Sequence, residues 1–232
     1  MALPSLATIK YELTVPSTGE TVEYRPFLVK EEKMLLIAQQ TGEEKDIIRA
    51  VENIISECTF KKLDPKKLPI FDIEYIFIQL RSKSIGEVST VMFTCPDDNE
   101  TKVEIDINLE EVKCEFPENH SNKIQLTNNI GIIMNYPRVT NVAGVDTEDP
   151  TAGFEIIKNC IAQIYDNEEV FDRNDISKKE LDDFINSMTH QQFMKVQEFF
   201  ESIPKVRYRT KIKNPNTGVN NEVVIEGMQN FF

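Results

Sequence analysis

The chain has 232 residues, enough for one large domain or two small ones that each bury a core. Hydrophobic residues make up 40% and charged residues 28%, as in globular proteins that fold in water. The formal net charge of -13 disfavours nucleic acid and anionic lipid as partners, because the average surface repels phosphate. The apolar runs are too short to span a bilayer, and the first residues do not have the pattern of a signal peptide. We therefore expect a cytoplasmic protein with no nucleic-acid partner and no membrane insertion.

The first 40 residues predict a hairpin followed by a helix. Residues 8–29 alternate apolar and polar side chains, and the polar segment Pro16–Gly19 interrupts the alternation, which is typical of an antiparallel hairpin. Residues 30–40 then place apolar side chains at helical spacing. These apolar residues are Met34, Leu35, Ile37 and Ala38.

A second helix is expected after Thr41-Gly42-Glu43-Glu44. This tetrapeptide has the spacing of a capping box, in which a threonine oxygen and a glutamate three residues later satisfy free backbone amides. The apolar face of the second helix includes Cys58, which we interpret as a core residue.

The segment 71–87, FDIEYIFIQLRSKSIGE, predicts a central helix with two apolar stripes. Such a helix packs on both sides, or packs on one side and meets a partner protein on the other. One stripe contains Phe71, Tyr75 and Ile78, and Arg81 follows one turn later. We predict that these four residues lie at a partner interface.

The hairpin after this helix raises the question of a metal site. A zinc ribbon needs four ligands, usually two cysteine pairs at C-x2-C spacing. Cys95 stands at the turn, but Asp98 occupies the position of its paired cysteine. In the last hairpin, Asn214 and Thr217 occupy the matching positions. We therefore predict no metal site and interpret Cys95 as a small apolar residue at a turn.

The second half of the chain is expected to be mostly helical. One helix is predicted over 154–164, and two capping boxes, Ser177–Glu180 and Thr189–Gln192, mark two further helix starts. Residues 206–225 predict a final hairpin. The fold class expected is α+β, with antiparallel hairpins and a part resembling a helical bundle. The division expected is 1–118, a connector 119–150, and 151–232.

The last two residues, Phe231 and Phe232, need cover from water. They can dock on the core of the chain or in a neighbour, because an exposed aromatic pair promotes association. We include both among the predicted partner-interface residues.

No catalytic or cofactor motif is recognisable. The chain has two histidines and lacks nucleophile-elbow, zinc-protease and phosphate-loop patterns, so we predict no catalytic residues, no cofactor and no enzyme activity. A glycosidase-like carboxylate pair stays open as an alternative, but nothing selects one pair among 39 acidic residues. The pairs considered are Glu43/Glu44, Glu110/Glu111 and Asp182/Asp183.

Several segments resemble the baseplate hub subunits or hub assembly proteins of T-even-type contractile-tailed bacteriophages. They are YRPFLVKEEKMLLIA, FDIEYIFIQLRSKSIGE, FINSMTHQQFMKVQEFFESIPK and IEGMQNFF, in this order along nearly the whole chain. The resemblance implies a late phage protein that helps to build the central hub through protein-protein contacts. It would act in the host cytoplasm during assembly and be found in the virion tail baseplate if it stays there.

Two functions from different classes follow. The first is a structural or chaperone-like assembly protein whose partners are other hub proteins, with self-association left open. The second is a cell-wall hydrolase of the tail tip that uses a carboxylate pair. We rank the second lower, because sugar-binding clefts usually contain aromatic platforms and tryptophan is absent.

Overall fold

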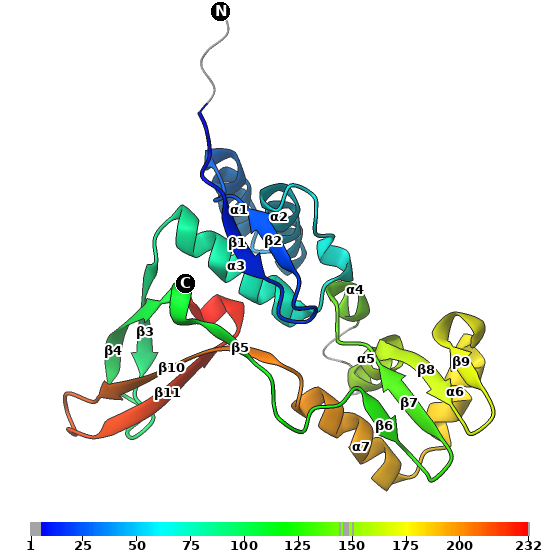
Figure 1. The fold of residues 1–232 in the computed structure, drawn as a ribbon. Helices are drawn as coiled ribbons and strands as arrows, with labels where there is room; N and C mark the ends of the chain where they lie inside the picture. Colours follow the sequence, from blue (N-terminus) through cyan, green and yellow to red (C-terminus); the bar gives the residue numbers. More distant parts are fainter. Residues whose placement is uncertain (1–5, 144, 146–148, 150, 232) are drawn as a thin grey trace, which may run out of the picture. The chain divides into compact units, whose positions relative to one another are not determined.

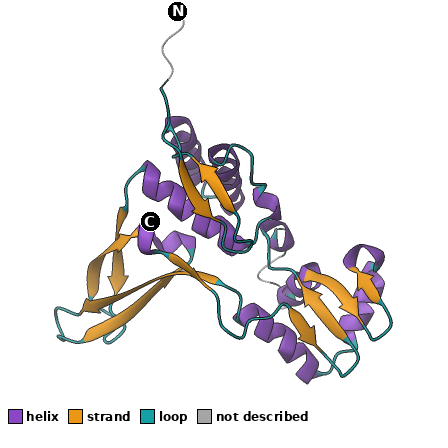
Figure 2. Cartoon of the chain, in the orientation of Figure 1, coloured by secondary structure: helices purple, strands orange, loops and turns teal. Residues whose placement is uncertain are grey.

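The computed structural model describes residues 6–143, 145, 149 and 151–231, and they form two compact units (Figure 1). Unit 1 consists of residues 1–115 together with 205–232, and unit 2 is the continuous segment 116–204. Helices and antiparallel strands occur in both units, which confirms the predicted α+β class (Figure 2). Among the described residues, none of the helices has the length and apolar character needed to cross a membrane.

The described residues of unit 1 form three helices and three antiparallel sheets, in which β1 pairs with β2, β3 with β4, and β10 with both β5 and β11. Its helices and strands, in chain order, are β1 (Tyr11–Thr14), β2 (Thr21–Tyr24), α1 (Val29–Thr41), α2 (Glu44–Cys58), α3 (Ile70–Ser84), β3 (Val88–Thr94), β4 (Lys102–Asn108), β5 (Lys113–Glu115), β10 (Lys205–Lys213) and β11 (Asn220–Glu226). Short 3₁₀ turns lie at Pro65–Lys67, Leu109–Glu111 and Met228–Phe231.

Helix α3 is the central element of unit 1, as its two apolar stripes predict. It contacts α2, β5, β10 and the 3₁₀ turns 109–111 and 228–231. Most of its apolar side chains are buried, so hydrophobic burial on both sides holds it in place. The buried apolar residues are Phe71, Ile73, Ile76, Phe77, Ile78 and Leu80.

Two carboxylates of α3 connect it to both ends of the chain. Asp72 is fully buried and accepts hydrogen bonds from the backbone nitrogen of Ser17, at 3.0 Å, and from its hydroxyl. Glu74 accepts a hydrogen bond from the backbone nitrogen of Met228. Burial raises the pKa of both carboxyl groups. The β1–β2 turn and the C-terminal 3₁₀ turn are therefore fixed on the same helix.

The three hairpin turns of unit 1 share one backbone conformation. In each, the residue before the proline accepts a hydrogen bond from the amide four positions later: Gly19 to Val15, Asn99 to Cys95, and Gly218 to Asn214. The donor residue has positive φ in all three turns, at 70°, 56° and 76°. Glycine adopts this conformation without steric cost, and asparagine is the residue type that replaces it most readily. A proline directly follows the acceptor residue in all three turns, so a similar local sequence gives a similar turn.

The C-terminal hairpin belongs to unit 1, which differs from the predicted division into 1–118, 119–150 and 151–232. The reason is that β10 pairs with β5, with Lys205 opposite Glu115 and Val206 opposite Cys114. The carboxylate of Glu115 also binds Arg209 in a bidentate ion pair with two contacts of 2.7 Å. These hydrogen bonds and charges join segments that lie 90 residues apart in the chain.

Unit 2 is a four-stranded antiparallel sheet in the order β6-β7-β8-β9, accompanied by helices (Figures 1 and 2). Its elements are β6 (Lys123–Gln125), β7 (Gly131–Met134), α4 (Val139–Val142), α5 (Ala152–Cys160), β8 (Ile161–Tyr165), β9 (Val170–Asp172), α6 (Lys178–Asn186) and α7 (His190–Glu201), with a 3₁₀ turn at Arg173–Asp175. Part of the predicted connector, residues 144, 146–148 and 150, lies outside the described residues.

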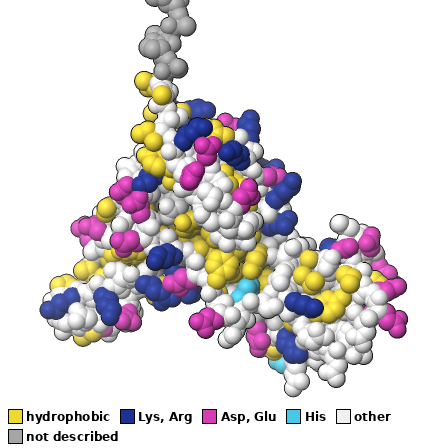
Figure 3. Space-filling view, viewed as in Figure 1, with side chains coloured by type: hydrophobic (Ala, Val, Ile, Leu, Met, Phe, Trp, Pro, Cys, Tyr) yellow, Lys and Arg dark blue, Asp and Glu magenta, His cyan; other side chains and the backbone are white. Residues whose placement is uncertain are grey.

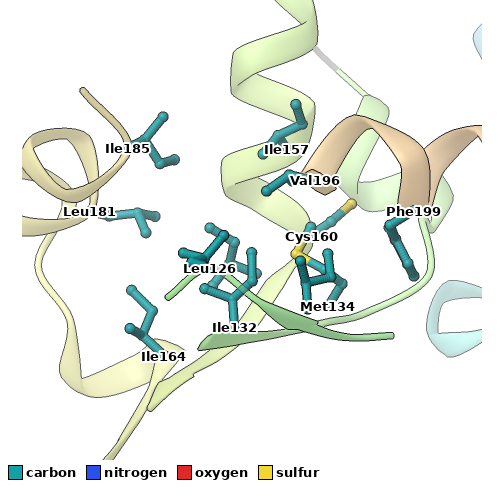
Figure 4. Close-up of a cluster of buried hydrophobic side chains, with 12 residues drawn as sticks. Leu126, Ile132, Met134, Ile157, Cys160, Ile164, Leu181, Ile185, Val196 and Phe199 are labelled. Carbon is teal, nitrogen blue, oxygen red and sulfur yellow. The ribbon is translucent and has the colours of Figure 1, made fainter. Parts of the chain in front are cut away.

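One hydrophobic cluster forms the core of unit 2 (Figure 4). It joins side chains of the sheet, such as Ile132 and Met134, to side chains of the helices, such as Leu181 and Val196, all of them buried. Removal of these side chains from water stabilises unit 2.

The prediction of a helix over 154–164 was wrong for its last four residues, 161–164. Helix α5 ends at Cys160, and Ile161 and Ile164 lie in β8 between β7 and β9. Apolar residues at 157, 160, 161 and 164 fit the helical period, but β8 gains hydrogen bonds to two neighbouring strands. The helices α5, α6 and α7 nevertheless make up most of residues 151–204, and the predicted hairpin follows them as β10 and β11.

Two of the three predicted capping boxes are confirmed. The side chains of Ser177 and Thr189 accept hydrogen bonds from the backbone amides of Glu180 and Gln192. In return, the side chains of Glu180 and Gln192 accept hydrogen bonds from the backbone amides of Ser177 and Thr189. The box at Thr41 was wrong, because Thr41 is the last residue of α1 and Gly42 closes that helix in the left-handed conformation. Helix α2 starts at Glu44 without a side-chain cap.

Candidate functional site

Three of the six predicted partner-interface residues are buried in unit 1. Phe71 is 4% exposed, and Ile78 and Phe231 are fully buried. Helix α3 contacts β5, β10 and the turn 228–231 of the same chain. Phe231 thus docks on the core of its own chain, which is one of the two placements expected for it.

The remaining predicted interface residues are less buried. Tyr75 and Arg81 are half-buried on α3, and Phe232 lies outside the described residues. Burial lowers the pKa of Arg81. Within the part of α3 assigned to the interface, these two side chains are the ones with surface left for a partner, and their role there stays a prediction.

The positions that resemble half of a zinc ribbon come together in the structure. The turn of the β3–β4 hairpin meets the turn of the β10–β11 hairpin, and amide groups fill the space between them. The side-chain nitrogen of Asn214, a buried residue, donates to both carboxylate oxygens of Asp97 at 3.0 and 3.1 Å and to Asp98 at 2.9 Å. Thr217 and Asn221 also donate to Asp97. We call this group of Asp97, Asp98, Asn214, Thr217 and Asn221 the tip network.

The tip network joins the two hairpins through hydrogen bonds to carboxylates. Its hydrogen bonds lower the pKa of Asp97 and Asp98, so both carboxylates stay ionised at neutral pH. Cys95 beside them is fully buried, and burial together with the two carboxylates raises the pKa of its thiol. Among the described residues, no group of three or more histidine, cysteine and acidic side chains is placed to hold a metal ion.

Helix α1 carries large apolar side chains on its exposed side. Val29 is 65%, Leu36 54% and Ile37 63% exposed, and the spacing of seven and eight residues puts all three on one face. We call Val29, Leu36 and Ile37 the α1 face. The side chains of α1 that are buried are Ala38 and Glu31.

The orientation of α1 follows from a buried ion pair. The carboxylate of Glu31 binds the guanidinium group of Arg25 at 2.9 Å and also accepts a hydrogen bond from the backbone nitrogen of Leu28. Both charged side chains are almost completely buried. Because Glu31 faces inward, the residues five and six positions later face outward.

The sequence contained a signal for the α1 face. Five consecutive apolar residues, Met34–Ala38, exceed what one side of a helix can bury. Hydrophobic periodicity alone does not tell which of them faces the core, and it gave no reason to place Glu31 inside.

Members of two acidic pairs and His120 take part in contacts between elements. Glu110 binds Lys83, and Asp182 binds Lys158 at 2.7 Å. His120 stacks on Tyr136 and Phe199, and its Nδ1 lies 2.9 Å from the hydroxyl oxygen of Ser202. These contacts hold secondary-structure elements together.

Comparison with known proteins identifies relatives for nearly the whole chain. The family model described as "T4 bacteriophage base plate protein" matches residues 7–232. Baseplate hub assembly protein gp26 of Enterobacteria phage T4 is 25% identical over 226 residues, which cover 96% of this chain and 98% of that protein. No solved structure matches the chain. The chain belongs to the T4 bacteriophage base plate protein family.

Proposed function

We propose that this protein helps to build the central hub of a phage tail baseplate by binding other hub proteins, without enzymatic turnover. The observation that carries the proposal is the match to the base plate family over residues 7–232. The curated relative is named as a hub assembly protein, and the similarity spans almost all of both chains. The finer claim, a chaperone-like action through direct contacts, rests on the surfaces of the chain.

The α1 face is the surface of unit 1 that best suits such a contact. The side chains of this face are more than half exposed: Val29, Leu36 and Ile37. Each Å² of apolar surface that a partner removes from water contributes about 25 cal/mol to the free energy of binding. Tyr75 and Arg81 are proposed as secondary contacts because they keep part of their surface. Phe71, Ile78 and Phe231 are proposed to act indirectly, by holding α3 and the C-terminal turn in place.

Affinity purification from infected cells tests the proposal. The tagged chain is expected to recover other hub proteins, and Leu36→Glu/Ile37→Glu is expected to lose them because charges cannot be buried in an apolar contact. The matched control is Gln39→Glu/Gln40→Glu, which adds the same charge at exposed polar positions of the same helix. Both variants should keep the melting temperature of the parent, since all four positions are exposed. Equal recovery of hub proteins by parent, variant and control would reject the α1 face as the contact.

Two further measurements address location and turnover. Mass spectrometry of purified particles distinguishes a resident baseplate subunit from a factor that leaves after assembly in the host cytoplasm. Zymography on peptidoglycan tests the absence of hydrolase activity, and no lytic band is expected. A band that disappears on substitution of one acidic residue would replace the proposal by the hydrolase alternative.

A further inference from the structure

Unit 2 has an open groove between the β8–β9 hairpin and α6. Its volume is about 310 Å³, enough for one or two large side chains. All of its lining residues belong to unit 2. They are Ile130, Ile164, Tyr165, Asp166, Phe171, Asp175, Ile176, Glu180 and Phe184.

The floor of the groove is apolar and partly exposed. Phe171 is 40% and Ile130 37% exposed, whereas Ile164 beneath them belongs to the core of the unit. Phe184 packs against the same core from α6. Figure 3 shows hydrophobic side chains gathered over the sheet of this unit. Aromatic and aliphatic side chains left open beside a core are typical of a surface that binds another apolar group.

The rim of the groove is negatively charged. Asp166, Asp175 and Glu180 line it. Arg173, in the adjoining 3₁₀ turn, donates a hydrogen bond to the backbone oxygen of Ile176 at 3.0 Å. Asp166 accepts hydrogen bonds from two backbone amides, and Glu180 accepts them from Ser177 at the start of α6. These bonds lower the pKa of both carboxyl groups, so the rim keeps its charge at neutral pH.

The groove lies beside an open sheet edge. Strand β9 is the outermost strand, and its three residues are exposed. An extended segment of another protein can add to such an edge through backbone hydrogen bonds. Glu168 and Glu169 precede β9, and charges at an edge strand discourage pairing with neutral or acidic segments. A segment with basic side chains would instead be attracted to these two carboxylates.

We propose that this groove binds an extended basic segment of a partner protein, which places one large apolar side chain against Phe171 and Phe184 and lysine or arginine side chains against the rim. The proposal rests on the function proposed above and specifies the chemistry of one partner. It assigns separate contacts to the two units: an apolar helix face in unit 1 and an acidic groove in unit 2.

Two synthetic peptides test the proposal on the full chain. The basic probe is acetyl-Lys-Val-Lys-Phe-Lys-Val-Lys-amide, and the matched acidic probe has glutamate in place of each lysine. By fluorescence anisotropy the basic probe is expected to bind at least about tenfold more tightly, and added salt should weaken it. In ¹⁵N-labelled protein the amide signals of β8, β9 and α6 should shift. Equal binding of the two probes, or shifts confined to other elements, would overturn the proposal.

Matched variants separate the groove from the total charge of the chain. Asp175→Asn/Glu180→Gln should weaken the basic probe about fivefold or more, and glutamine at 180 preserves the capping box. Phe171→Ala should weaken it by a similar factor through the apolar contact. The control Glu118→Gln/Glu201→Gln removes two exposed charges of unit 2 outside the groove and should leave affinity unchanged. A control that weakens binding as much as the groove variant would show attraction to net charge alone and reject the site.

The failure of this proposal is distinguishable from failure of the proposed function. If the parent recovers hub proteins from infected cells but binds the basic probe no better than the acidic one, the groove is rejected and the hub role stands. If the groove variants lose both the probe and one particular hub protein, the groove is its binding site. If the parent recovers no hub protein, the hub role fails while the probe experiment still decides the chemistry of the groove.

Discussion

Unit 1 and unit 2 differ in how the chain runs through them. Besides its apolar core, unit 1 joins the first and last parts of the chain through polar contacts, namely Asp72 with Ser17, Glu74 with Met228 and the tip network. Unit 2 is one continuous segment around a single apolar cluster. Contacts between distant segments carry a larger entropy cost of loop closure than contacts within one segment. Unit 1 should therefore depend on the completeness of the chain, and unit 2 should not.

Dissection of the chain should show the largest difference. We expect residues 116–204 to fold alone, because the whole cluster of unit 2 lies within them. Residues 1–115 alone should not fold stably, since β10, β11 and Phe231 are missing. Circular dichroism and the dispersion of amide signals in NMR spectra measure both.

A third protein provides the control for this dissection. Glu115 and Lys205 lie opposite each other in an antiparallel pair, so a two-residue Asn-Gly turn can join them in place of 116–204. This shortened chain should recover the fold of unit 1. A folded 1–115 fragment would contradict the proposed dependence on the C-terminal hairpin.

Removal of one buried aromatic ring should have the next largest effect. Phe231→Ala deletes a fully buried side chain and should reduce the free energy of unfolding of unit 1 by about 3–5 kcal/mol. Denaturant titration followed by NMR should show unit 1 signals lost first and unit 2 signals unchanged. Phe60→Ala, at a 40% exposed position of unit 1, is the matched control and should cost far less. Similar costs for the two variants would mean that Phe231 does not belong to the core.

The tip network should make a smaller contribution to the free energy of unfolding of unit 1, and this contribution should depend on pH. Asn214→Ala removes hydrogen bonds to two carboxylates and should cost about 1–3 kcal/mol at neutral pH. The pKa of Asp97 and of Asp98 is lowered from 3.8 in the folded protein, so their contribution is complete above that value and is lost as pH falls below it. Thermal unfolding of parent and variant should therefore converge in acid. A constant difference from pH 7 to pH 2 would argue against ionised carboxylates in the network.

Helix caps in unit 2 should give the smallest effects. Ser177→Ala removes the side-chain acceptor at the start of α6 and should cost about 1 kcal/mol, measured by denaturant unfolding of unit 2. Ser177→Asp keeps an acceptor and should restore most of that stability. If alanine is as stable as serine, the capping box does not stabilise α6.

Local signals in the sequence predicted local structure well. The proline turns, each with a glycine or asparagine at positive φ, the apolar stripes of α3 and the boxes at Ser177 and Thr189 are patterns of neighbours within a few residues. What was not predicted depends on contacts that a periodic pattern does not show. The isoleucines of β8 form a strand because β7 and β9 flank them, and α1 exposes apolar residues because Glu31 is held inside by Arg25, which lies before the helix.

The candidate sites follow the same rule. The spacing of Cys95, Asp98, Asn214 and Thr217 correctly suggested two matching turns, but only the structure brings them into contact. The groove of unit 2 combines residues from 130 to 184 and has no motif, because its shape depends on the packing of α6 beside the β8–β9 hairpin. The burial of Phe71 and Ile78 was not predicted, because α3 packs against β5 and β10, which lie far apart in the chain.

The position of Phe231 has a consequence for the order of events during translation. Residues 205–231 are synthesised after the whole of unit 2, so α3 lacks its contacts with β10 and the turn 228–231 until then. Because β10 pairs with β5, we expect unit 1 to complete its fold after unit 2 has been made.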